Sequence, residues 1–141
     1  MNVIYSDKIK DLPSEQLRRL FMLAGWSDGL ESSDQRKYFN IPFINSTLVI
    51  SAWEDGRLIG AVRVLSDTIF RSVIYDLIIE PESQGKGIGR ELVRRCIEHF
   101  PDSEWLVETT EKTANFYERI GFRANKGVFL RIPTKHFGRN D

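Results

Sequence analysis

The chain has 141 residues, of which 41% are hydrophobic, so it is long enough to bury one sizeable apolar core. Its 20 Lys and Arg residues balance 20 Asp and Glu residues, and neither nucleic acid nor a membrane surface is therefore an expected partner. The N-terminal stretch lacks a signal-peptide pattern, and one cysteine excludes an intrachain disulfide framework. We expect a single domain over residues 1–133 and a polar tail over residues 134–141, in the cytoplasm.

The first third of the chain is typical of one short strand followed by helices and loops. Val3 to Tyr5 predict the strand. Pro13 suits the first turn of a helix, and apolar residues recur behind it at helical spacing from Leu17 to Ala24. Residues 25–29 then predict a loop, and residues 34–39 a second short helix.

Three strands in series are expected in the middle of the chain. Residues 47–53, 58–65 and 70–79 are rich in apolar and β-branched side chains. Asp55 and Gly56 separate the first two segments, and an Asp-Gly pair marks a tight hairpin turn. The three segments therefore predict an antiparallel meander.

A glycine-rich loop, Gln84-Gly85-Lys86-Gly87-Ile88-Gly89, follows the third of these strands and precedes a helical segment, Arg90 to Phe100. Glycine lets the backbone approach an anion closely, and free N–H groups at a helix start point at it. The spacing matches neither the Walker pattern nor the dinucleotide fingerprint, because Arg90 stands where the latter requires its third glycine. The loop predicts a phosphate site; the alternative is a turn that only joins a strand to a helix.

The remaining elements continue the alternation of strands and helices. Cys96 lies on the apolar side of the helix after the glycine loop, so we expect a buried structural thiol. Residues 105–109 predict a strand, residues 113–120 a helix ended by Gly121, and residues 127–132 a last strand. One cysteine and two histidines without ligand spacing predict no metal site.

Two motifs in a fixed order carry a resemblance to a known family. The first is Gln84-x-x-Gly87-x-Gly89, and the second is the segment from Thr113 to Phe122, with Phe-Tyr before Gly-Phe. With the order of elements, they resemble the GCN5-related N-acetyltransferases, and the segment from Trp53 to Phe129 is similar to the plant-type serotonin (arylalkylamine) enzymes. The resemblance implies an α/β (α+β) fold: a mixed, mostly antiparallel sheet with a splayed strand pair and flanking helices. It also implies acetyl-CoA as the acyl donor and CoA as the product.

The resemblance further implies which residues hold acetyl-CoA. Backbone groups of the strand that ends at Ile79 would pair with the pantetheine arm, and the glycine loop would hold the pyrophosphate. The expected cofactor-binding residues are Leu77, Ile78, Ile79, Gln84, Gly85, Lys86, Gly87, Ile88, Gly89, Arg90, Asn115 and Tyr117.

Three side chains are candidates for proton transfer. The resemblance places Tyr117 near the thioester sulfur, as a general acid for the departing thiolate. Asp76 is a carboxylate within an apolar strand and is the first candidate base, although it is equally typical of a structural carboxylate satisfied by backbone or arginine neighbours. Glu108 is a second candidate base, and water a further one. Strand alternation places Tyr75 on the side of Leu77 and Asp76 on the opposite side, unless a bulge shifts the pattern.

The acceptor is expected to bind at the loops between residues 22 and 43, whose aromatic and acidic side chains suit a small aromatic or cationic amine; alternatively, the aromatic residues only cover the core. The expected reaction is acetyl transfer to a primary amine of a small molecule, by direct attack through a tetrahedral intermediate, in a monomer or homodimer. Acetylation of protein amino groups is the alternative, and a non-catalytic acyl-CoA-binding module is a third. The aromatic residues of these loops are Trp26, Tyr38, Phe39 and Phe43.

Overall fold

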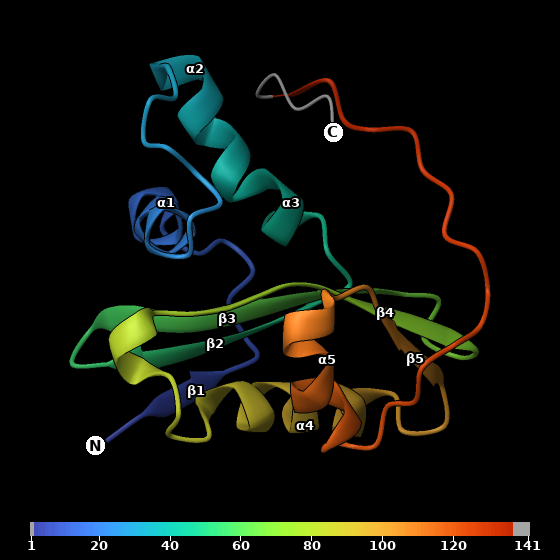
Figure 1. Ribbon diagram of the computed structural model, residues 1–141. Helices are drawn as coiled ribbons and strands as arrows, with labels where there is room; N and C mark the ends of the chain where they lie inside the picture. The colour runs from blue at the N-terminus through green and yellow to red at the C-terminus, as the bar shows by residue number, and fades with distance from the viewer. Residues whose placement is uncertain (1, 137–141) are drawn as a thin grey trace.

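Five strands form one sheet in the order β1-β2-β3-β4-β5 in the computed structural model, which describes residues 2–136 (Figure 1). The first four strands pair antiparallel, and β5 runs parallel to β4. This confirms the mixed, mostly antiparallel sheet expected from the sequence. The strands are β1 (Ile4–Ser6), β2 (Leu48–Glu54), β3 (Arg57–Ser66), β4 (Arg71–Ile79) and β5 (Glu104–Val107).

Helices cover both faces of the sheet (Figure 1). One layer holds α1 (Ser14–Leu23), α2 (Ser33–Arg36) and α3 (Ile41–Ile44), with the 3-10 turn η1 (Lys37–Phe39) between the last two. The opposite layer holds α4 (Ile88–His99) and α5 (Glu111–Glu118), and the 3-10 turn η2 (Pro81–Ser83) leads from β4 towards α4. None of the helices within residues 2–136 is long and apolar enough to cross a membrane.

Each helical layer has its own apolar core against the sheet. The core under α4 and α5 includes Ile74 and Cys96, and the core under α1 to α3 includes Phe43 and Ile78. Cys96 is completely buried, and burial raises the pKa of its thiol to about 12. The expectation of a buried thiol is confirmed, and a thiol with this pKa is not an activated nucleophile.

The strand expected at residues 127–132 does not form, although the structure describes these residues, and that prediction is wrong. Its apolar side chains are exposed, with Val128 85% and Ile132 91% accessible. Figure 1 shows this segment as an extended trace outside the sheet. Composition gives a segment a tendency to extend, but a strand needs a neighbouring strand that receives its hydrogen bonds. Part of the expected polar tail, residues 137–141, lies outside the described residues.

Candidate active site

The parallel strands β4 and β5 are joined over only half of β4. Their register ends with Ile74 opposite Val107, where β5 stops, while β4 continues to Ile79. From Tyr75 onward, β4 therefore has an open edge on the side away from β3, in the described part of the chain. This confirms the splayed strand pair.

The backbone groups on this open edge can be assigned from the pairing with β3. The backbone N–H of Glu80 donates to the carbonyl of Ile59 at 2.9 Å, so the backbone groups of Glu80 point towards β3. Because successive residues of an antiparallel strand point alternately to either side, the N–H and C=O groups of Ile79 and Leu77 face the open edge.

An extra residue in β4 lies at the start of the open edge. Asp76 and Leu77 together stand opposite Val62, where the register with β3 shifts, and Asp76 has a φ of +50°. Aspartate tolerates this left-handed conformation better than most residues. The bulge turns Leu77 to the α4 and α5 core and leaves Asp76 on the α1 to α3 side. Tyr75 does not share the side of Leu77, since its ring lies 5.1 Å from the guanidinium of Arg63; the bulge has shifted the simple alternation.

The glycine loop presents unpaired backbone donors. Gly85 and Gly87 have φ values of +78° and +84°, and a Cβ built at either would meet nothing within 4 Å. No acceptor among residues 2–136 receives the N–H groups of residues 85–90, in accord with the free first turn of α4. The Gln84 side chain donates to the carbonyl of Ile79 at 3.2 Å and so ties the loop to the end of β4. The loop fits a bound pyrophosphate, because its donors converge where a helix begins.

Glu80 anchors the start of this loop. It is completely buried and accepts hydrogen bonds from Arg19 at 2.7 Å, Arg57 at 3.0 Å and Ser83 at 2.7 Å. Burial opposes ionisation of Glu80, but the hydrogen bonds from Ser83 and the two arginines outweigh it and lower the pKa. One carboxylate therefore joins α1, the start of β3 and the segment that leads to the glycine loop.

Tyr117 packs into the α4 and α5 core, against which Leu77 and Ile79 of β4 also pack. It is 8% exposed, and its ring meets Phe116 and Phe122 edge-on, with centroids 4.9 and 5.5 Å away. Burial, with a smaller contribution from Cys96, raises the pKa of Tyr117 to about 12, so the phenol stays protonated at neutral pH. A Cβ on Gly89 would lie 3.2 Å from the Phe116 ring. Glycine at this position thus lets the two sequence motifs approach each other.

The structure separates the three candidates for proton transfer. Tyr117 lies in the α4 and α5 core, whereas Asp76 lies on the opposite face of the sheet. Glu108 follows the end of β5 and is exposed, as is Asn115 on α5. Asp76 accepts a hydrogen bond from Nε of Arg63 at 2.6 Å, which is the arginine-satisfied arrangement that its sequence left open.

A pocket of about 920 Å³ opens between the α1 to α3 layer and the sheet. Phe21 stacks on Trp26 with ring centroids 5.7 Å apart and also meets Phe39 at 5.3 Å. Phe39 and Phe43 are buried in the core as well, so these aromatic residues both cover the core and line the pocket. The sheet contributes Asp76 and Arg63 to the lining.

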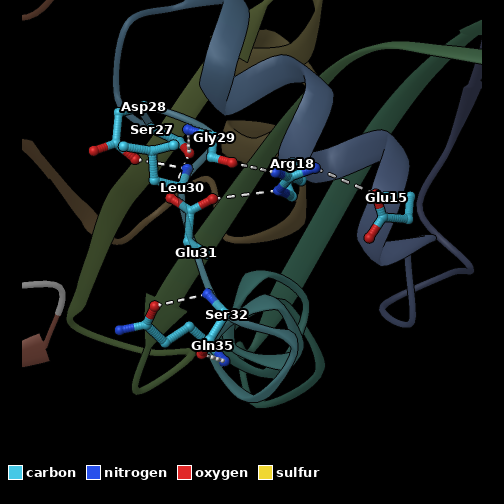
Figure 2. A network of polar contacts seen from close by, with 9 residues as sticks. All are labelled: Glu15, Arg18, Ser27, Asp28, Gly29, Leu30, Glu31, Ser32 and Gln35. Carbon is cyan, nitrogen blue, oxygen red and sulfur yellow. Dashed lines mark hydrogen bonds and ion pairs between the residues drawn. The ribbon is translucent and has the colours of Figure 1, made fainter.

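A hydrogen-bonded loop forms part of the pocket rim (Figure 2). Arg18 of α1 donates to Glu31 at 3.2 Å, and the hydroxyl of Ser27 donates to the same carboxylate at 2.6 Å. The hydrogen bond from Ser27, with those from the backbone and Arg18, lowers the pKa of Glu31, so this carboxylate is ionised at neutral pH and paired with Arg18. A capping box then starts α2 directly after this loop.

Sequence reasoning missed Arg63 and Glu80. Arg63 is a charged residue within the apolar segment 58–65, as Asp76 is within the next strand. Two opposite charges within neighbouring apolar strands could have indicated that the two side chains pair. Glu80 showed no comparable signal, because its two arginine partners lie 61 and 23 positions away in the chain.

The geometry, a splayed sheet and a glycine loop with unpaired backbone donors before a helix, fits a class of protein, the acyl-CoA-dependent transferases. Residues 17–131 match the family profile described as "Acetyltransferase (GNAT) domain". The chain belongs to the GCN5-related N-acetyltransferase (GNAT) family, and it is an acetyltransferase of this family.

Individual relatives agree with this assignment. An uncharacterized N-acetyltransferase, ycf52, of Pyropia yezoensis is 27% identical over 137 residues, which are 89% of this chain and 76% of that protein. The chloroplastic serotonin N-acetyltransferase 2 of rice is 29% identical over 70 residues, which are 48% of this chain and only 35% of that protein. A probable acetyltransferase structure from Staphylococcus aureus, SA2161, shares the fold with a TM-score of 0.73 at 19% identity, over 93% of this chain and 100% of that one.

Proposed function

We propose that the protein transfers the acetyl group of acetyl-CoA to the primary amine of a small molecule. The observation that carries this proposal is the position of Asp76. Its backbone lies on the open edge of β4, which leads to the glycine loop, and its side chain lines the aromatic pocket. A donor held along β4 and an acceptor held in the pocket would therefore meet at this bulge. The pocket is large enough for a small molecule, and its lining combines aromatic rings with polar and charged side chains.

Acetyl-CoA supplies an activated thioester carbonyl, and the residues along β4 and the loop fit its chemistry. The outward N–H and C=O groups of Leu77 and Ile79 would pair with the amides of the pantetheine arm, as in the addition of a strand. The unpaired N–H groups of residues 85–90 would hold the pyrophosphate, with the exposed Lys86 and Arg90 nearby. Asn115 would bond the pantetheine arm or an ordered water.

The transfer forms the amide C–N bond and breaks the thioester C–S bond. The N–H of Leu77 would hydrogen-bond the carbonyl oxygen, a contribution of about 3 kcal/mol where water is excluded. Asp76, or Glu108 or water in its place, would take one proton from the acceptor ammonium, and the second proton of the amine ends on the CoA sulfur. Tyr117 would present its O–H to that sulfur. A thiol ordinarily has a pKa of about 8.5, whereas the pKa of Tyr117 is about 12, so the phenol gives up its proton less readily than the CoA thiol does. The main contribution that we assign to Tyr117 is therefore a hydrogen bond to the thiolate.

We also propose that residues 1–133 act as one catalytic domain in a reducing compartment such as the cytoplasm. Cys96 supports this, because the chain's only thiol is buried in the core.

Paired glycine variants test the donor site. Gly87→Glu places a side chain and a negative charge where the pyrophosphate would lie. Gly56→Glu is the matched control, since Gly56 also has a positive φ, +75°, and nothing within 4 Å of its Cβ position, but lies in the β2–β3 turn. We expect calorimetry to show loss of CoA binding in folded Gly87→Glu alone. Equal CoA affinity in the two variants would contradict the donor site.

A further inference from the structure

Arg63 and Asp76 form a charged pair at the sheet side of the aromatic pocket. Nε of Arg63 donates to Oδ2 of Asp76 at 2.6 Å, and the two side chains are 17% and 34% exposed. One residue comes from β3 and the other from the bulge of β4, and both line the pocket. The pair is therefore accessible to a ligand and lies where the acetyl group would be transferred.

Each member of the pair keeps unused hydrogen-bonding capacity. The Arg63 guanidinium is held by two rings, 6.0 Å from the centroid of Phe43 and 5.1 Å from that of Tyr75. Its Nη1 lies 3.5 Å from the Ser46 hydroxyl, and its Nη2 has no partner among the residues that the structure describes. Oδ1 of Asp76 likewise receives no hydrogen bond from them. A fixed donor and a fixed acceptor of opposite charge thus lie side by side.

We propose that the acceptor is an α-amino acid with an aromatic or large apolar side chain. Its ammonium and carboxylate are separated by one carbon, so they can meet Asp76 and Arg63 together. The side chain then lies against the rings of Phe21, Trp26 and Phe39. This inference rests on the proposed function and names the substrate class of the same site.

A simple arylalkylamine satisfies this pocket less well. It would cover Arg63 without offering an anion, and a desolvated donor without a partner lowers affinity. The amino terminus of a peptide has the same defect, because its carboxylate is replaced by an amide. The carboxylate is therefore the group that should decide between acceptors.

Matched substrate pairs test the inference in the native protein. We expect L-tryptophan and L-phenylalanine to have kcat/KM values at least tenfold above those of tryptamine and phenethylamine, measured as CoA thiol release. Tryptophan amide, which keeps the amine and loses the carboxylate, should behave as the decarboxylated amine does. Equal or higher kcat/KM for the decarboxylated amines would overturn the inference. A protein that binds CoA but acetylates neither the amino acid nor the decarboxylated amine of either pair would also overturn the inference. The proposed function itself fails only if no amine of a wide panel is acetylated.

Arginine variants separate recognition from a structural effect. Arg63→Gln should raise KM for L-tryptophan at least tenfold more than it raises KM for tryptamine, since only tryptophan loses a partner for its carboxylate. Arg71→Gln is the matched control, because Arg71 is also a strand arginine paired with a carboxylate, Glu104, but lies outside the pocket; it should change neither value. An equal loss for both substrates in Arg63→Gln would overturn the assigned role. If Arg63→Gln does not fold, Arg63→Lys, which keeps the charge but not the fork of donors, serves in the same comparison.

Discussion

Replacing Glu80 with Gln tests how the glycine loop is held. The change keeps the size of the side chain and removes the charge that two arginines and Ser83 share. Removing one member of a buried ion pair costs about 3–5 kcal/mol. The side chains of Arg19 and Arg57 are 35% and 47% exposed and can turn to water, so we discount this to about 2–3 kcal/mol. For a chain of this length, that free energy lowers Tm by about 6–12 °C.

The neighbouring carboxylate provides a matched control for this change. Glu82 lies 3.6 Å from the same Arg19, but its side chain is 70% exposed. Glu82→Gln should therefore change the free energy of unfolding by less than about 0.5 kcal/mol. Thermal unfolding gives the comparison, and calorimetry with CoA should show weaker binding in Glu80→Gln alone. Indistinguishable melting temperatures in the two variants would refute the reasoning, because the buried carboxylate would then contribute no more than an exposed one.

Two further predictions concern proton transfer. Tyr117→Phe should lower kcat about 10- to 100-fold with CoA affinity unchanged, because one hydrogen bond to a charged sulfur is lost. Since the pKa of Tyr117 is raised to about 12, the native kcat profile should show no fall due to this phenol below pH 10; such a fall, absent from Tyr117→Phe, would contradict that value. Asp76→Asn keeps a residue type that tolerates the left-handed backbone, and it should lower kcat/KM by about 10²-fold or more because the acceptor amine loses its proton acceptor. A lower Tm with unaltered kcat/KM would transfer that role to Glu108 or to water.

Features fixed by neighbouring residues could be predicted from the sequence. The Asp55-Gly56 turn, the glycine loop and the buried Cys96 each depend on a few adjacent positions, and the structure has all three. The short helix α3 was missed, because its Pro42 was not recognised as a residue of a first helical turn.

Features that depend on pairing between distant segments could not be predicted. The bulge at Asp76 exists because β3 supplies one residue, Val62, where β4 supplies two. The contact between Asp76 and Arg63 follows from that register, and no pattern within either strand fixes it. The strand predicted at residues 127–132 does not form for a related reason. Its composition suits a strand, but a tendency to extend does not supply a partner edge.

The bulge at Asp76 gives β4 one residue more than a regular alternation of its faces needs. Ile74 and Leu77 both pack against the α4 and α5 layer although they are three positions apart, an odd interval that a regular strand would place on opposite faces. A substitution at position 76 changes one side chain. A deletion there would remove the bulge and make the alternation regular, so that Leu77 and Ile79 keep the α4 and α5 face and Ile78 keeps the opposite one. The two apolar cores therefore do not need residue 76, and what its loss would remove is the carboxylate that β4 turns towards the pocket.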